Sequence, residues 1–420
     1  MKRLVCLTVL FCLLVGAVAS ADEMKMGNPK KLGLSGERMG RIDAMLERNI
    51  AEGKAVGAVG VIARHGKIAY LKAFGQQDCD NGPAMGEDTI FRVYSMTKPL
   101  TAVGLMMLYE QGLFRLEDPV WWYLPEFKDM KVAVEETDAK TGEKVFTTVP
   151  AERAITVRDL LRHTSGIGYG APPETTLGKM YEEAKLFDPS CTLAEIVKKL
   201  SELPLMYHPG KYYEYGFSID VAGRLIEVLS GKPYDVYMKE HLFDPLGMMD
   251  TGFYVPAEKM ARFAGLYCMK ENKLEAVPVG EKIAWDFTKP PTMLSPGGGA
   301  VSTARDYLKF AQMLLNKGEF NGVQFLSPKT IQLMTEDHLG DIARPWWAPK
   351  ELGLVFSIEK EPGTEGKLGS KGTFGWSGAA STQCWVDPSE DMVTLFMVQV
   401  LGDCYLPELF KITAYQTIVK

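Results

Sequence analysis

The sequence predicts an α/β protein whose sheet is built from the two ends of the chain. Residues 56–75 alternate apolar and polar side chains around His65 and Gly66, which is the pattern of a β-hairpin. Alternating, strand-like segments return beyond residue 350. Between these ends, from about residue 113 to 290, helix starts and loops predominate. Strands at both ends with helices between them favour one sheet with a mostly helical insertion.

The helix signals begin close to the N-terminus. Residues 35–55 have helical apolar spacing, with Ser35 as the candidate N-cap. From Leu100 to Tyr109 almost every residue is apolar, so this segment is predicted to be a helix buried on all sides. Gly112 follows as a candidate C-cap.

Further along the chain, capping patterns mark two more helices. Thr156 and Asp159 have the spacing of a capping box, and Thr303 and Asp306 repeat it after a glycine-rich loop. Residues 218–231 keep helical spacing up to a terminal glycine, and the C-terminal residues are expected to form a closing helix. The strands expected near the C-terminus lie in "LGLVFSIEK", "TFGWSGAASTQCWVD" and "MVTLFMVQV".

Composition limits the classes of function. The chain has 420 residues, 46% of them hydrophobic, which is enough for a large core. The net charge is -6 and no basic tract occurs, so nucleic acid is not an expected partner. The five histidines form no H-E-x-x-H or His-x-His pair, and the sequence therefore predicts neither a metal site nor a cofactor.

Residues 1–21 have the layout of a cleavable signal peptide. A basic start is followed by an apolar run to Val15 and by small residues at Ala17, Ala19 and Ala21. The run is short for a membrane span, and no later stretch is long enough, so a periplasmic or secreted protein is expected. A retained N-terminal anchor is the alternative. Seven cysteines occur, two of them in this leader, and zero or one disulfide is expected.

The candidate catalytic residues are Ser95 and Lys98, three positions apart at the start of the predicted buried helix. In a helix, residues three apart share a face, and a serine at the N-terminus meets free N–H groups and the positive end of the dipole. A lysine against an apolar helix loses hydration, which lowers its pKa and would let it act as a base. A second match, Ser357 to Lys360, lies in a strand-like segment, where such residues point to opposite faces.

Six ordered motifs identify a resemblance that covers roughly residues 35–418. They are "YSMTKP", "LEDPVWWYLPEF", "LLRHTSGI", "PGKYYEYGFSIDVAGRLIEVLSG", "PGGGAVSTARDYLKFAQMLLNKGE" and "FGWSGAASTQCWVDP". The chain resembles the serine β-lactamase and penicillin-binding-protein superfamily, and within it the class C-type carboxylesterases called family VIII. The resemblance implies an antiparallel sheet flanked by helices. Residues 22–112 and 291–420 would form this α/β subdomain, and residues 113–290 a mostly helical subdomain.

The resemblance also implies catalytic roles. Ser95 corresponds to the nucleophile, and Lys98 to its general base. Tyr215 corresponds to the tyrosine that passes the proton to the leaving group. The N–H groups of Ser95 and Ala379 correspond to the oxyanion hole.

Two departures from the β-lactamase pattern bear on the substrate. Phe217 stands where those enzymes have the asparagine of Tyr-x-Asn, and Trp376-Ser377-Gly378 stands in place of Lys-Thr-Gly. An indole offers no charge to a substrate carboxylate, only an apolar face and one N–H. The predicted substrate is therefore a small neutral ester with a short chain, bound in part by Phe217, Trp376, Ser377 and Gly378.

Other interpretations remain open at this level. A β-lactamase or D-Ala carboxypeptidase of the same fold is the main alternative, and a non-catalytic relative is another. Acyl transfer to a hydroxyl acceptor would use the same residues. His163, which could suggest a Ser-His-Asp triad, is interpreted as structural, and no serine lies in G-x-S-x-G. Oligomeric state and disulfide pairing are not determined.

Overall fold

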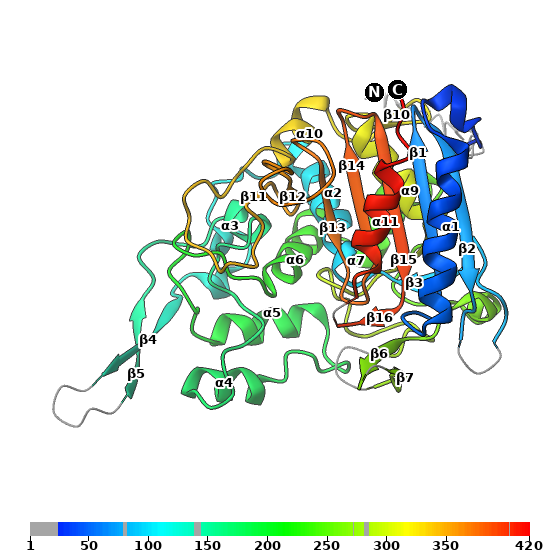
Figure 1. Cartoon of the computed structure of the whole chain (residues 1–420). Coiled ribbons are helices and arrows are strands. Elements are labelled where there is room, and N and C mark those ends of the chain that lie inside the picture. The colour runs from blue at the N-terminus through cyan, green and yellow to red at the C-terminus, as the bar shows by residue number, and fades with distance from the viewer. Residues whose placement is uncertain (1–23, 79–81, 138–143, 272, 281–284, 403) are drawn as a thin grey trace, which may run out of the picture.

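The computed structural model describes residues 24–78, 82–137, 144–271, 273–280, 285–402 and 404–420 (Figure 1). The predicted leader and Cys79 lie outside this part of the chain. Within it, one antiparallel sheet of seven strands takes its members from both ends of the sequence, as predicted. Its order is β11 (Glu351–Leu352), β12 (Ser357–Ile358), β13 (Phe374–Ser377), β14 (Gln383–Asp387), β15 (Met392–Val398), β1 (Gly57–Arg64) and β2 (Lys67–Gly75).

The predicted hairpin is the pair β1 and β2. His65 and Gly66 connect the strands with φ values of +52° and +68°, the left-handed turn that matches strand twist. Strand β1 is buried along its whole length because helices cover both faces. A Cβ at Gly60 would lie 2.5 Å from the ring of Phe410, so the absence of a side chain allows the C-terminal helix to approach the sheet.

Helices lie on both faces of the sheet. Helices α1 (Gly36–Ala51) and α11 (Leu406–Tyr415) cover one face, and α9 (Ala304–Leu315) packs on the other (Figure 1). Ser35 caps α1 as expected, by accepting the N–H of Arg38. Thr303 accepts the N–H of Asp306 at 3.2 Å, but the carboxylate of Asp306 accepts the N–H of Asp250 instead of closing a capping box.

The buried apolar helix is α2 (Thr97–Glu110), which packs against the inserted helices. The helices beyond it are α3 (Val157–Leu161), α4 (Thr176–Ala184), α5 (Leu193–Glu202), α6 (Ser218–Ser230), α7 (Tyr234–Met238), α8 (Asp244–Leu246) and α10 (Pro328–Met334). Short 3₁₀-helical segments are η1 (Pro29–Leu32), η2 (Tyr94–Met96), η3 (Val120–Trp122), η4 (Pro125–Phe127) and η6 (Ala257–Arg262), and η5 (Lys239–Phe243) is a short π-helical segment.

The inserted region also contains strands that the sequence analysis missed. A hairpin of β4 (Lys131–Thr137) and β5 (Lys144–Pro150) projects away from the helices in Figure 1. Beyond the hairpin itself, β4 forms a parallel bridge from Val132 to Leu205, with two backbone hydrogen bonds. The other small pairs are β3 (Ile90–Arg92) with β8 (Val301–Thr303), β9 (Glu319–Phe320) with β10 (Val323–Gln324), and β6 (Tyr267–Lys270) with both β7 (Lys273–Ala276) and β16 (Val400–Leu401).

The α/β subdomain and the helical subdomain are more interleaved than the residue ranges predicted for them. Strand β6 lies within the range assigned to the helical insertion, yet it pairs in parallel with β16 beside the main sheet. Conversely, the segment after α10 returns to the helical side, where Nε of Arg158 donates to Nδ1 of His338 at 3.1 Å. The active-site residues described below come from both regions.

Several smaller observations complete the description. None of the described helices has the length and apolarity to span a bilayer. Cys191, Cys268, Cys384 and Cys404 are free thiols in the structure. Within the described ranges, no three His, Cys, Asp or Glu side chains gather as metal ligands would.

A buried carboxylate fixes the loop that follows α3. Asp159 completes the predicted capping box with Thr156 and accepts hydrogen bonds from Arg162 at 2.9 Å and from Thr164 at 2.8 Å. Burial raises the pKa of Asp159, but the hydrogen bonds from Arg153, Thr156 and Arg162 outweigh it and lower the pKa to about 2. This network orients the loop that carries His163 toward the centre of the molecule.

The Asp159 network predicts a specific acid sensitivity. A carboxyl group whose pKa is lowered by folding stabilises the protein above its unfolded pKa of about 4. That contribution is lost as the pH falls toward 2, and for a shift to about 2 it amounts to about 2 kcal/mol. Between pH 4 and pH 2 the wild type should therefore lose about 2 kcal/mol more unfolding free energy than Asp159→Asn, measured by urea denaturation.

The matched control is Asp341→Asn, which alters an exposed carboxylate in a loop. It should lose as much unfolding free energy over this range as the wild type. Equal pH dependence for the wild type and Asp159→Asn would contradict the assignment of this network.

Candidate active site

Ser95 lies on a sharp turn between strand β3 and helix α2. Tyr94, immediately before it, is buried and has a φ of +42°, a left-handed conformation that non-glycine residues rarely adopt. The N–H of Val93 donates to the carbonyl of Ala300 at 3.1 Å, which continues the pairing of β3 with β8 up to the turn. The turn leaves Ser95 partly exposed at the start of α2, where the sequence predicted it.

The first turn of α2 is anchored to the glycine-rich loop 296–300. Thr97 accepts the N–H of Ala300 at 3.0 Å, and the hydroxyl of Thr101 donates to the carbonyl of Pro296 at 2.7 Å. From helix α9, Tyr307 donates to the carbonyl of Met96 at 2.9 Å. These buried bonds explain why the glycine-rich motif, about 200 residues later in sequence, belongs to the site.

The structure brings Ser95, Lys98 and Tyr215 together. Nζ of Lys98 donates to Oγ of Ser95 at 3.2 Å, and the hydroxyl of Tyr215 donates to the same oxygen at 2.8 Å. Lys98 is fully buried, and its ammonium also donates to Oη of Tyr169 at 3.1 Å and to the carbonyl of Gly297 at 2.6 Å. The serine oxygen thus lies between two groups that can move its proton.

The charge state of Lys98 differs from the expectation. Burial has the largest single effect and lowers its pKa, but Tyr169, Tyr215 and Asp220 together outweigh burial, so the pKa of Lys98 is raised. The ring of Tyr215 also lies 4.6 Å from Nζ and stabilises the cation. The prediction of a lysine with a lowered pKa is therefore wrong, because oxygen atoms and ring faces surround the buried nitrogen. The direction of this pKa shift favours the ammonium form of Lys98 in the resting site.

Tyr215 is positioned by the loop after α3. A Cβ at Gly216 would lie 2.3 Å from the carbonyl carbon of Gly168, so the two backbones can touch only because the residue is glycine. The ring of His163 lies 4.8 Å from that of Tyr215, and both ring nitrogens of this buried histidine lack hydrogen-bond partners among the described residues. Burial lowers the pKa of His163 well below its ordinary value, so it is neutral. It packs against Tyr215 and does not form a triad with Ser95.

Ala379 lies in the turn between β13 and β14, beside the Ser95 segment. A Cβ on Gly378 would lie 2.5 Å from the carbonyl oxygen of Val93, and Ala380 packs against Tyr94. Between these two contacts, the N–H of Ala379 has no acceptor among the described residues. It is free to donate to a substrate oxygen, as an oxyanion-hole group must.

Trp376 and Phe217 occupy different places around the site. The indole of Trp376, on β13, lies 6.1 Å from the ring of Tyr215, and Ser377 beside it is exposed. Phe217 is only 1% exposed and lies beneath the rings of Tyr169 and Phe187, at 4.8 and 4.9 Å. Phe217, expected to contact substrate, therefore supports the wall of the site instead of lining it.

Two residues that the sequence analysis did not select complete the site. Tyr169 follows the "HTSG" motif and bonds to Lys98. Asp220 is a fully buried acid on the apolar face of α6, and its Oδ1 accepts Oγ of Ser295 at 2.9 Å and the N–H of Gly297 at 3.2 Å. A buried acid within an apolar helix pattern was the sequence signal that could have indicated Asp220. It holds the loop whose Gly297 carbonyl accepts the Lys98 ammonium.

Comparisons with known proteins identify the family. The model of the Beta-lactamase family matches residues 42–405 of the chain. Protein Rv1367c of Mycobacterium tuberculosis is 36% identical over 359 residues, which cover 83% of this chain and 86% of that protein. Esterase EstB of Burkholderia gladioli is 29% identical over 378 residues, covering 85% of this chain and 89% of EstB.

Solved structures show the same fold. EstCE1, described as a hydrolase with promiscuous acyltransferase activity, matches with a TM-score of 0.74 at 24% identity, covering 90% of this chain and 98% of that one. Simvastatin synthase LovD of Aspergillus terreus matches with a TM-score of 0.74 at 23% identity, covering 91% of this chain and 98% of that one.

This fold, with esterases among the relatives, defines a serine hydrolase. The chain belongs to the Beta-lactamase family, and the family predicted from the six motifs is confirmed.

The contact between Asp220 and the glycine-rich loop predicts a positioning role. Burial raises the pKa of Asp220 itself, and its ionised form in turn raises the pKa of Lys98. Asp220→Asn preserves the shape and removes this charge, which should lower the pKa of the Lys98 ammonium. We expect kcat to fall about tenfold, because the Gly297 carbonyl shifts, with KM nearly unchanged. The rise of activity with pH should move toward acid, measured as kcat/KM between pH 6 and 9.5.

The control for Asp220 is Asp235→Asn, on helix α7 outside the site. It should retain both the rate and the pH profile of the wild type. A purely structural role for Asp220 would lower activity equally at every pH, and that result would contradict the positioning role.

Proposed function

We propose that the protein is a carboxylesterase that cleaves short-chain esters of neutral carboxylic acids through an acyl-enzyme on Ser95. The observation that carries the proposal is the indole of Trp376 against the ring of Tyr215. A β-lactam or a D-Ala-D-Ala terminus carries a carboxylate, and a tryptophan offers it no charge. An ester lacks that carboxylate and has a better leaving group than an amide.

The relatives add independent support for ester chemistry. EstB is named an esterase, and a protein of Penicillium rubens that is 26% identical over 383 residues is named lovastatin esterase. Other relatives have different names, including N-acetylmuramyl-L-alanine amidase from Bacillus subtilis at 27% identity. The family therefore includes both ester and amide chemistry, and the residues around Ser95 favour the ester.

Acylation begins with a proton transfer from Ser95. Because the pKa of Lys98 is raised, the reactive form is the one in which this ammonium has lost one proton. Nζ of Lys98 then takes the proton of Ser95 as Oγ bonds to the ester carbonyl carbon. The N–H of Ala379, with that of Ser95, stabilises the oxyanion. The bond to the alcohol breaks, the alcohol leaves with the proton from Tyr215, and Lys98 returns a proton to Tyr215.

Deacylation repeats these steps with water. Tyr215 takes a proton from a water molecule, whose oxygen bonds to the acyl carbon, and passes its own proton to Lys98. The bond to Oγ breaks, and Lys98 gives the proton to Ser95. A hydroxyl acceptor in place of water would give acyl transfer by the same route.

Export is a further part of the proposal. The pattern of residues 1–21 supports a periplasmic or secreted protein. Expression of the full chain in a bacterial host followed by N-terminal sequencing would test this, with a mature protein that begins after the leader as the expected result. A protein that retains residues 1–21 in the membrane fraction would contradict it.

Hydrolysis of p-nitrophenyl butyrate and of nitrocefin, measured side by side, tests the central assignment. We expect rapid hydrolysis of the butyrate ester and slow hydrolysis of nitrocefin. Ser95→Ala should lower both by at least about a thousandfold, because no acyl-enzyme can form. Ser389→Ala, at the far end of the β14–β15 hairpin, should behave as the wild type.

The other outcomes separate the alternatives. Faster nitrocefin hydrolysis would overturn the argument from Trp376 and favour a β-lactamase. Activity retained in Ser95→Ala would exclude Ser95 as the nucleophile. Analysis of the products in the presence of an added alcohol would separate hydrolysis from acyl transfer.

The charge state of Lys98 predicts how the rate depends on pH. A raised pKa keeps the proton on Lys98 at neutral pH, and the reactive form must lose it. The value of kcat/KM for p-nitrophenyl butyrate, corrected for spontaneous hydrolysis, should therefore rise from pH 6 to pH 9.5. A profile that is flat or falls over this range would show that Lys98 is neutral in the resting enzyme.

A further inference from the structure

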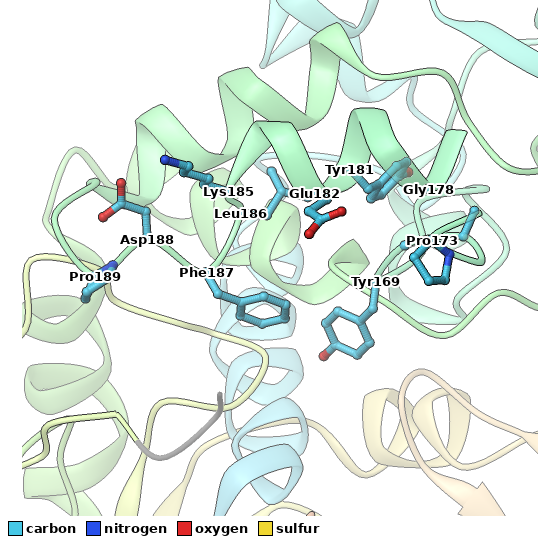
Figure 2. A pocket seen from close by; sticks show the side chains of 12 residues that line it. Tyr169, Pro173, Gly178, Tyr181, Glu182, Lys185, Leu186, Phe187, Asp188 and Pro189 are labelled. Carbon is cyan, nitrogen blue, oxygen red and sulfur yellow. The ribbon is translucent and has the colours of Figure 1, made fainter. Parts of the chain in front are cut away.

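A pocket of about 490 Å³ opens beside the catalytic groups (Figure 2). Tyr169 forms its inner end, and the hydroxyl of this tyrosine is 3.1 Å from Nζ of Lys98. The ring of Tyr169 also lies 5.6 Å from that of Tyr215, the residue that would protonate the leaving alcohol. A group bound in this pocket would therefore be attached to the alcohol side of the ester.

Aromatic rings form one wall of the pocket. The rings of Tyr169 and Phe187 lie 6.0 Å apart, and each residue remains more than a third exposed. Phe217 lies behind both, and Trp285 lies 6.4 Å from Phe187. The rings are therefore fixed from behind while their outer faces are open to a ligand.

The pocket also carries a negative charge. The carboxylate of Glu182, from helix α4, has no ion-pair or hydrogen-bond partner among the described residues, and in Figure 2 it lies over the space between Phe187 and Tyr169. Lys185 and Asp188 lie toward the other end of the same view. With two acidic side chains and one basic side chain, the lining has a formal charge of -1.

Aromatic faces next to an unpaired carboxylate are the chemistry that recognises an alkylammonium group. The ring faces attract a cation through their quadrupoles, and the carboxylate adds a direct charge. A small alkylammonium also fits the partly apolar lining better than a strongly hydrated metal ion would. The absence of a cation at position 376 is consistent with a cationic ligand, since Trp376 offers no charge to a substrate carboxylate.

We propose that this pocket binds the cationic head of an amino-alcohol ester, so that the enzyme prefers esters whose leaving alcohol carries a substituted ammonium group. The inference rests on the proposed esterase function and specifies its substrate class. The reaction is unchanged: the acyl group passes to Ser95, and the amino alcohol leaves with the proton from Tyr215. Glu182 and Phe187 bind the departing group and take no part in proton transfer.

A pair of esters of nearly equal shape tests the proposal. The charged substrate is 2-(trimethylammonio)ethyl butyrate, and the neutral one is 3,3-dimethylbutyl butyrate, in which carbon replaces nitrogen. In 50 mM salt, the wild type should have a kcat/KM at least about tenfold higher for the charged ester, measured by pH-stat titration. This preference should shrink at 500 mM salt, because the exposed carboxylate is screened.

Substitutions locate the source of the preference. Glu182→Gln should lower kcat/KM about fivefold for the charged ester and less than twofold for the neutral one. Phe187→Leu, which keeps an apolar side chain but removes the ring face, should also reduce the ratio between the two esters. Glu183→Gln is the matched control, because it alters an exposed carboxylate on the same helix that does not line the pocket.

The outcomes distinguish this inference from the proposed function. Equal rates for the two esters, or a preference that survives Glu182→Gln and Phe187→Leu, would overturn the cationic pocket while leaving the esterase intact. An equal loss in Glu183→Gln would show a general surface charge effect and would also overturn it. If neither ester is hydrolysed and Ser95 is not labelled by a fluorophosphonate, the proposed esterase function itself fails.

Discussion

The buried ammonium of Lys98 is the constraint on which the rest of the site depends. A charge removed from water must be compensated by oxygen atoms and ring faces, or the fold loses several kcal/mol. Here the carbonyl of Gly297, the hydroxyls of Ser95 and Tyr169 and the ring of Tyr215 provide that compensation. These groups come from four separate segments, so the position of one nitrogen fixes the relation between the sheet region and the inserted helices.

The same constraint explains residues that do not touch a substrate. Asp220 holds the Gly297 loop, and His163 supports the ring of Tyr215 from behind. Gly216 allows the tyrosine segment to touch the backbone at Gly168. A buried charge with several partners requires each partner to be held in turn, so the polar and close-packed contacts extend well beyond the three reacting groups.

The side chains around the site favour one class of substrate in both proposals, the esterase function and the cation-binding pocket. Trp376 removes the cation that a carboxylate substrate would need, and Glu182 adds a negative charge beside exposed rings. Both changes disfavour anionic substrates, one by loss of attraction and the other by repulsion. An ester with a neutral acyl group and a cationic alcohol suits both features. The proposed esterase function and the proposed pocket therefore point to the same substrate class.

The sequence by itself determined the split sheet, the buried helix α2 and the family, because apolar periodicity and local motifs are encoded in neighbouring residues. It placed Ser95, Lys98 and Tyr215 among the candidates by spacing and resemblance. Tertiary structure alone decided the charge of Lys98, since its partners are up to about 200 residues away in sequence. It also decided that Phe217 lies beneath the wall and that Tyr169 and Glu182 border one pocket, because burial and proximity arise only when distant segments pack together.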